Sequence, residues 1–238
     1  MTRPLTSSLL LAAAAVCCAG ASLASPRIID QSCVPSGCFP GDRPGLPVEI
    51  EEAGSYRFAS NLLLGRSDPR GVLIRVSNVH IDMAGFAVIG ENRCEWTGES
   101  TECELNRWGA AIESVTSADG VSVVNGSIRG IEGDGMALAG EGNRVRDITV
   151  LEVSGNGIAL GGAATVAGCT VDRAGRTGIY APTGGGPVLI SRSTVSRATW
   201  AFNAGALDNV AARFNGQGIT GLPSVIDGSE DQFNVLTP

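Results

Sequence analysis

A short unit that begins with a glycine and an apolar residue recurs along this chain. It occurs at residues 135–138, 157–160 and 178–181, and more weakly at 218–221. The first three glycines are 22 and 21 residues apart, and the stretches between them are rich in Val and Ile without a helical period. A repeat of this length and composition is typical of a β-solenoid, in which each unit forms one coil.

The composition agrees with a thin aliphatic core interrupted by many turns. The 238 residues include 33 glycines, 43% are hydrophobic and only 5% are aromatic. Glycine favours tight turns, and evenly spread apolar residues argue against disorder. We therefore expect one solenoid domain over residues 48–238, with an insertion at 90–108 where the repeat is lost.

The first residues have the pattern of an export signal. Arg3 is followed by an apolar run at 9–18 and by small residues at 22–24, so residues 1–24 are predicted to be a signal peptide. No later segment is long and apolar enough to span a bilayer. The protein is therefore expected to be secreted or periplasmic. Residues 25–47, rich in Pro and Gly, read as an irregular leader.

Cys17 and Cys18 fall in the predicted signal peptide, and the five cysteines that follow it suit an oxidising compartment. Cys33 with Cys38 and Cys94 with Cys103 are natural local pairs, each expected to contribute about 2–3 kcal/mol to stability. Their spacing is wrong for a zinc site, and the only histidine, His80, has no ligand partner nearby.

The charge balance excludes some partners. All 17 basic residues are arginines, and 24 acidic residues give a net charge of −7. Such a chain repels phosphate backbones, so no nucleic-acid partner is expected. The absence of lysine excludes Schiff-base chemistry.

Aligning the repeats assigns residues to columns. The largest predicted inward column contains Ile128, Val150, Val171 and Val195, and a neighbouring one contains Ile148, Cys169 and Ser193. Cys169 is therefore read as a buried small hydrophobe. Because side chains alternate between the two faces of a strand, Ser127, Thr149, Thr170 and Thr194 are predicted to point outward and to form a polar ladder. A second polar ladder, at a turn, contains Asp134, Asn156, Thr177 and Gln217, and hydrogen bonding between coils is its favoured role.

Several stretches resemble one known family. They are residues 78–86 (Asn-Val-His-Ile-Asp-Met-Ala-Gly-Phe), residues 123–130 (Val-Val-Asn-Gly-Ser-Ile-Arg-Gly) and the Gly-Asp-Gly-Met of 133–136. The chain is similar there to exported bacterial right-handed parallel β-helices, often called pectate-lyase-like, although that family has Asn-Gly where this chain has Ala84-Gly85. Most members have no assigned reaction. The resemblance and the repeat length together predict a right-handed parallel β-helix of seven or eight coils.

No established catalytic signature of β-helix enzymes is present, so the catalytic candidates come from the alignment. Glu152, Arg173 and Arg197 fall in one outward column at a strand end, with Asp172 beside Arg173. An arginine there could act as a base or clamp a uronate carboxylate. No motif assigns a cofactor with certainty, and Ca²⁺ is the one that Asp172 and Glu152 could hold. The alternative is a set of salt bridges that decorates the sheet.

The insertion supplies the candidate binding residues. Trp96 and Trp108 lie there with five glutamates, and exposed tryptophans stack on sugar faces. Thr149, Thr170 and Thr194 are further substrate-binding candidates. The alternative, favoured for the insertion, is that both rings pack it against the solenoid.

Two functions follow from these patterns. The first is a secreted protein that binds, and in a lyase-like reaction processes, an extracellular or cell-wall polysaccharide. The second is a non-enzymatic surface or assembly scaffold that presents loops to a partner. The first rests partly on the groove geometry of the fold, and the second on the missing catalytic signatures.

Overall fold

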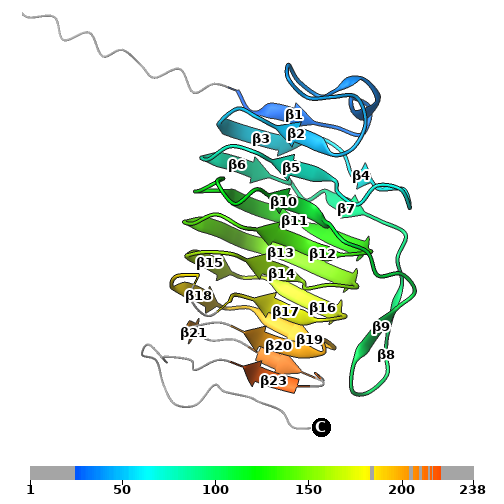
Figure 1. Cartoon of the computed structure of the whole chain (residues 1–238), viewed down its shortest axis with the longest axis vertical. Coiled ribbons are helices and arrows are strands. Elements are labelled where there is room, and N and C mark those ends of the chain that lie inside the picture. Colours follow the sequence, from blue (N-terminus) through cyan, green and yellow to red (C-terminus); the bar gives the residue numbers. More distant parts are fainter. Residues whose placement is uncertain are drawn as a thin grey trace, which may run out of the picture.

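The computed structural model describes residues 25–182, 185–203, 206–208, 211–213, 215 and 217–220. In this part of the chain the regular elements are β-strands and one short 3-10 turn, η1 (Val34–Ser36), and the coils stack along one axis (Figure 1). The predicted all-β parallel β-helix is confirmed. The predicted signal peptide, residues 1–24, lies outside the described residues.

The solenoid has about six turns, fewer than the seven or eight predicted. The prediction divides the length of the domain by the repeat length, which assumes that every residue belongs to a coil. Residues 94–103, however, form a separate hairpin outside the coils. Part of the length therefore adds no turn.

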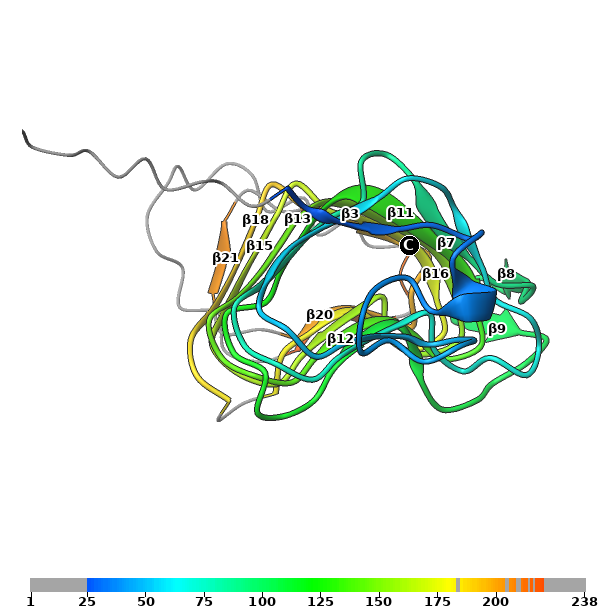
Figure 2. The same ribbon diagram turned by 90° about the horizontal axis from the view of Figure 1, so that it is seen from above.

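Two parallel sheets form the walls, and they face each other across the interior (Figure 2). The smaller has eight strands, which are β2 (Val48–Ile50), β5 (Val72–Ile74), β10 (Ala110–Ser114), β12 (Asp134–Leu138), β14 (Ile158–Leu160), β17 (Thr177–Tyr180), β20 (Trp200–Asn203) and β23 (Gln217–Thr220). The larger has thirteen, which are β1 (Arg27–Ile29), β3 (Gly54–Phe58), β4 (Leu62–Leu63), β6 (Val79–Asp82), β7 (Ala87–Ile89), β11 (Ser122–Ile131), β13 (Asn143–Val153), β15 (Ala164–Ala167), β16 (Thr170–Ala174), β18 (Val188–Ser191), β19 (Thr194–Ser196), β21 (Ala206–Asp208) and β22 (Ala211–Arg213).

The larger sheet bends, and its long strands β11 and β13 run through the bend, so that each contributes to both halves of this sheet. β11 pairs with β6 before the bend and with β7 after it. Asn125 in β11 and Asp147 in β13 have positive φ angles of 58° and 55° at this bend. Asn and Asp tolerate the left-handed conformation better than most residues, so the turn suits these sequences.

The predicted ladders of like residues form the core. Ile128, Val150, Val171 and Val195 are stacked in register and fully buried. The facing sheet contributes a second column, which contains Ile112, Met136, Ile158, Ile179 and Phe202. Coils about 4.8 Å apart bring these side chains into van der Waals contact, which explains why β-branched residues fill the columns.

Residues 25–47 cover the first coil and are more regular than predicted. Their strand β1 pairs with β3, Val34 is buried, and Phe39 meets Tyr56 edge-on with 5.2 Å between ring centroids. The predicted Cys33–Cys38 disulfide is present in this segment. The leader therefore shields the apolar end of the stack.

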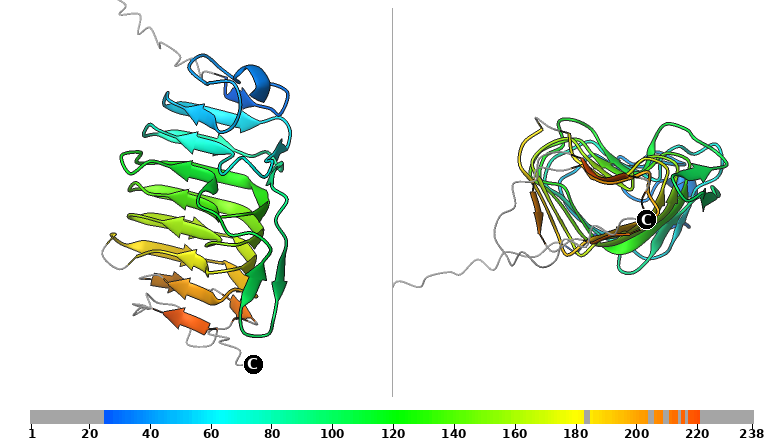
Figure 3. Two further views of the ribbon diagram at one scale, coloured as in Figure 1. Left: turned by 45° about the vertical axis from the view of Figure 1, so that its right-hand side comes forward. Right: turned by 90° about the horizontal axis from the view of Figure 1, so that it is seen from below.

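The insertion forms an arm, residues 90–109, that leaves the stack between β7 and β10. Its strands β8 (Cys94–Trp96) and β9 (Thr101–Cys103) make an antiparallel hairpin, closed by the predicted Cys94–Cys103 disulfide. The hairpin runs along the outside of later coils, roughly parallel to the solenoid axis (Figures 1 and 3). No helix in the described part of the chain is long and apolar enough to cross a bilayer.

Candidate functional site

The four residues predicted to be catalytic form one acid–arginine cluster: Glu152, Asp172, Arg173 and Arg197. The register of β13, β16 and β19 stacks Glu152, Arg173 and Arg197 at the same corner, as predicted. Arg197 donates from Nε and Nη2 to the two Asp172 carboxylate oxygens, at 2.7 and 2.6 Å. Arg173 Nη2 lies 2.7 Å from Glu152 and Nη1 lies 3.5 Å from Asp172. Each carboxylate in the cluster therefore faces a guanidinium.

The cluster is less exposed than the sequence suggested. Asp172 is buried, with 7% of its surface exposed, and it also accepts a 2.8 Å hydrogen bond from the Ser196 hydroxyl. Arg197, Arg173 and Ser196 surround this carboxylate, and the hairpin lies nearby, since β8 is close to β13 and β16 and the Thr101 hydroxyl donates to the Arg197 carbonyl. The catalytic role of the cluster stays a prediction. Each of its charges already has an ion-pair partner within the protein, while the buried Nε of Arg173 has no hydrogen-bond partner among the described residues.

The hairpin separates the two predicted tryptophans. Trp96, in β8, is half-buried, and its pairing partner Thr101 contacts the carbonyl of Arg197 in the acid–arginine cluster. Trp108, on the return leg of the arm, is 87% exposed and belongs to a different surface. The expectation that both rings pack the insertion against the solenoid is wrong for Trp108. Their roles in sugar binding stay predictions.

The outward threonine ladder exists in the predicted register. Thr149 pairs with Thr170 and Thr170 with Thr194, and Thr170 is exposed whereas the other two are half-buried. Each threonine alternates with a buried valine of its strand, so all three side chains lie on the outer face of the sheet. Their predicted contact with a substrate stays a prediction.

A groove lies where the coils turn into the eight-stranded sheet, a few residues beyond the corner that holds the acid–arginine cluster. This flank groove consists of two adjoining hollows of about 160 and 230 Å³, which share Arg107, Trp108 and Gly133. It is formed by residues 64–69, 90–91, 106–109 and 130–134 together with Gly155 and Arg176. Enclosed small-molecule pockets usually hold about 300–1,000 Å³, so these hollows suit segments of an extended ligand better than a compact one.

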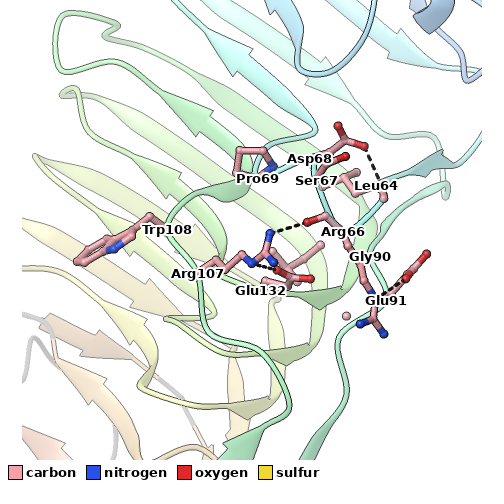
Figure 4. A pocket seen from close by; sticks show the side chains of 14 residues that line it. Leu64, Arg66, Ser67, Asp68, Pro69, Gly90, Glu91, Arg107, Trp108 and Glu132 are labelled. Atoms are coloured by element: carbon pink, nitrogen blue, oxygen red, sulfur yellow. Dashed lines mark hydrogen bonds and ion pairs between the residues drawn. The ribbon is translucent and has the colours of Figure 1, made fainter.

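The side chain of Arg107 is held by contacts with the wall of the groove, whereas the side chain of Trp108 is exposed to solvent. The Arg107 guanidinium lies 3.0 Å from the Glu132 carboxylate and donates to the Arg66 carbonyl at 2.8 Å. Figure 4 shows Arg107 pointing toward these partners and Trp108 pointing away from them. An exposed indole beside an anchored guanidinium offers a flat apolar surface with polar groups at its edge, which is an arrangement suited to stacking on a ring.

Asp134 and Arg176 lie at the other end of the groove. Asp134 Oδ1 accepts hydrogen bonds from the backbone N and the Nδ2 of Asn156, at 2.6 and 3.2 Å. Burial raises the pKa of the Asp134 carboxyl above its ordinary range, and the Asn156 hydrogen bonds and the Arg176 charge only partly oppose this. Arg176 is exposed and has no ion pair among the described residues. Its guanidinium is therefore available to a ligand.

Sequence reasoning assigned Asp134 to a structural ladder and overlooked its place in a groove. The ladder is real, since Asn156 also accepts a 3.2 Å hydrogen bond from the Thr177 backbone, while the side chain of Gln217 lies outside the described residues. One signal was present in the sequence: Asp134 is the ionisable member of a ladder whose other members are neutral. A buried carboxyl with a raised pKa in a cleft is a mark of functional sites.

The described residues contain no group of three or more His, Cys, Asp or Glu side chains arranged to hold a metal ion. The two carboxylates proposed for Ca²⁺, Asp172 and Glu152, instead have arginine partners. A calcium ion at the cluster would have to displace these guanidinium groups.

Comparison of the chain with models of protein families, with curated proteins and with solved structures finds no match. The residues of the flank groove are therefore the basis for a functional assignment.

Proposed function

We propose that the protein is exported and binds an extracellular or cell-wall polysaccharide along the flank groove. Support for export comes from the signal-like residues 1–24 and from two disulfides, which form and persist in oxidising compartments. Membership in the exported parallel β-helix family belongs to the same proposal, on the resemblance of residues 78–86 and 123–136.

The exposed Trp108 ring at the junction of the two hollows is the observation that carries this proposal. An indole that is 87% exposed gains little for folding, because its apolar surface stays in water. The same ring can cover the apolar face of a sugar, while Arg107 and Asp134 are close enough to line the same hollow. A long ligand would follow the axis, because the groove crosses coils that are stacked about 4.8 Å apart.

The free guanidinium of Arg176 favours an acidic polymer over a neutral one. The chain as a whole is acidic, so long-range electrostatics oppose a polyanion and a local contact has to offset this. Arg176 can form a two-pronged hydrogen bond with a carboxylate, as guanidinium groups do. Binding rather than cleavage is proposed, since the cluster that was predicted to be catalytic is satisfied by internal ion pairs.

The proposal is tested by calorimetric titration of the full chain with polygalacturonate as the acidic polymer and hydroxyethyl cellulose as the neutral one. Trp108→Ala is expected to weaken polygalacturonate binding at least about tenfold, as loss of a central aromatic contact does. Its unfolding free energy should change by no more than about 0.5 kcal/mol, because the ring is exposed. Leu189→Ala, an exposed apolar residue on β18, is the matched control.

Arg176→Ala, with Arg144→Ala as its control, examines the preference for an acidic polymer. Both arginines are exposed, but Arg144 lies on β13 in the other sheet. Only Arg176→Ala should reduce the affinity for polygalacturonate and its dependence on salt. The proposal is refuted if wild-type protein binds neither polymer, or if the groove variants and their controls behave alike. Release of an unsaturated product absorbing near 235 nm would add cleavage to binding.

A second function, a scaffold that presents loops to a partner, is favoured by the arm. Its hairpin is closed by a disulfide, lies outside the stack and exposes Glu95, Glu99 and Glu102. This function predicts a protein that binds no polymer and sediments as an assembly with its partner. A chain that sediments as a monomer in every mixture would argue against it.

A further inference from the structure

The return leg of the arm, residues 104–108, carries both Arg107 and Trp108. Whatever fixes this leg against the stack therefore also sets the outer wall of the flank groove. The leg has no regular secondary structure between β9 and β10, so its position depends on individual hydrogen bonds. One of these is the bond from the Arg107 backbone N to the Glu132 carbonyl.

The side chain of Asn92 forms hydrogen bonds both to this leg and to the stack. Asn92 lies where the arm leaves the stack, and only 3% of its surface is exposed. Its Nδ2 donates to the Leu105 carbonyl at 2.9 Å and to the Ile131 carbonyl at 3.1 Å. Its Oδ1 accepts from the backbone N of Leu105 at 3.0 Å and of Arg93 at 3.1 Å. All four hydrogen-bonding positions of the amide are thus occupied.

These four bonds join three segments of chain. Arg93 belongs to the outgoing leg, Leu105 to the return leg, and Ile131 to the end of β11 in the coil that lines the groove. The Cys94–Cys103 disulfide joins the two legs to each other but not to the coil. The contact of Thr101 with Arg197 anchors the hairpin to a later coil, through residues that do not line the groove. Asn92 is therefore suited to fix the return leg where the groove is formed.

We infer that Asn92 is a positioning residue for the flank groove, and that its buried amide holds Arg107 and Trp108 in place for a ligand. The inference rests on the proposed function, since it assigns a role at the same site. A buried amide suits this position because its two donors and its two acceptor sites satisfy four main-chain groups at once.

The test is Asn92→Asp, which keeps the shape and removes both donors. The matched control is Thr101→Val, which removes the hairpin contact to Arg197 and leaves the groove untouched. In a protein with Trp96→Phe and Trp200→Phe, Trp108 is the remaining tryptophan of the three, so its fluorescence anisotropy decay reports the mobility of the leg. Asn92→Asp is expected to add fast local motion to Trp108 and to weaken polygalacturonate binding at least about tenfold. Thr101→Val should change neither by more than about twofold.

The inference is overturned if Asn92→Asp leaves both the Trp108 anisotropy and the affinity as in wild type, or if Thr101→Val changes them equally. Hydrogen exchange of the wild-type protein covers the case in which Asn92→Asp fails to fold. The amide of Leu105 should then exchange more slowly than those of residues 98 and 99 at the hairpin tip, and equal rates would contradict this role of Asn92. If wild-type protein binds no polymer, the proposed function fails, while the anisotropy still decides whether Asn92 positions the leg.

Discussion

The acid–arginine cluster and the flank groove both place an aspartate and an arginine at a corner of the coils, but they use their charges differently. Asp172 in the cluster accepts hydrogen bonds from Nε and Nη2 of Arg197, and strand β8 of the arm lies close to its strand β16. Asp134 in the groove accepts hydrogen bonds from neutral donors of Asn156, and Arg176 beside it is exposed. Charges that neutralise each other serve the fold, whereas a charge without a partner is available to a ligand.

The backbone of the cluster supports this division. Glu152, Arg173 and Arg197 have φ angles of 55°, 56° and 51°, in the left-handed region. Gly130 occupies the same corner in the previous coil, and a glycine adopts this left-handed conformation at little cost in free energy. A non-glycine residue there costs on the order of 1 kcal/mol or more, so ion pairs that form only in the native stack offset local strain.

The largest expected effect on stability comes from removing an arginine of the acid–arginine cluster. Arg197→Ala should lower the free energy of unfolding by about 2–3 kcal/mol, because the buried Asp172 carboxylate loses its two-pronged partner. The value lies below that for a fully buried pair, since the Arg197 side chain is 41% exposed. Urea denaturation measures it, and polygalacturonate binding should be unchanged.

The double variant Asp172→Ala/Arg197→Ala is the control for this effect. It should be less destabilised than the sum of the two single variants, since each single change leaves one charge without its partner. A loss of polymer binding in Arg197→Ala at unchanged stability would move the functional site from the groove to the cluster.

A smaller effect is expected from neutralising the groove aspartate. The folded-state pKa of Asp134 is raised, so its contribution to stability is present at acidic pH and is lost as the pH rises through that pKa. Asp134→Asn should therefore melt at a higher temperature than wild type at neutral pH. The Oδ1 of the new amide can still accept the Asn156 hydrogen bonds.

The pH series supplies the internal control for Asp134→Asn. The difference in melting temperature should shrink as the pH falls toward the ordinary aspartate value of about 3.9, where the wild-type carboxyl is neutral too. The groups that face this carboxyl, Arg176 and Glu113, keep their identity in both proteins. A difference that grows on acidification would contradict the raised pKa.

The smallest effect concerns the core beneath both regions. Cys169 is buried in the column with Ile148 and Ser193, as predicted, and burial raises the pKa of its thiol to about 11. Because thiol reagents attack the thiolate, Cys169 of the native protein should not be labelled near neutral pH. In guanidinium chloride, with the disulfides intact, labelling of Cys169 should proceed readily. Rapid labelling of native protein would show that the columns open more easily than this structure implies.

The sequence predicted what depends on the repeat and missed what depends on contacts between distant segments. The columns of Val150 and Val171 follow from alternation within each coil, so alignment of the repeats was sufficient. The position of the hairpin beside the strand of Asp172 was not predictable in this way, because the hairpin comes from residues about 70 positions earlier in the chain. Trp96 and Trp108 are close in sequence, yet the turn of the hairpin sends them to different surfaces.

Hydrogen exchange of the full chain with and without saturating polygalacturonate tests the location of the binding site most directly. The groove assignment predicts slower exchange on binding in residues 104–109, 133–135 and 175–177, and no change in 152–153 or 196–198. Protection confined to the corner of the acid–arginine cluster, with the return leg of the arm unaffected, would contradict it.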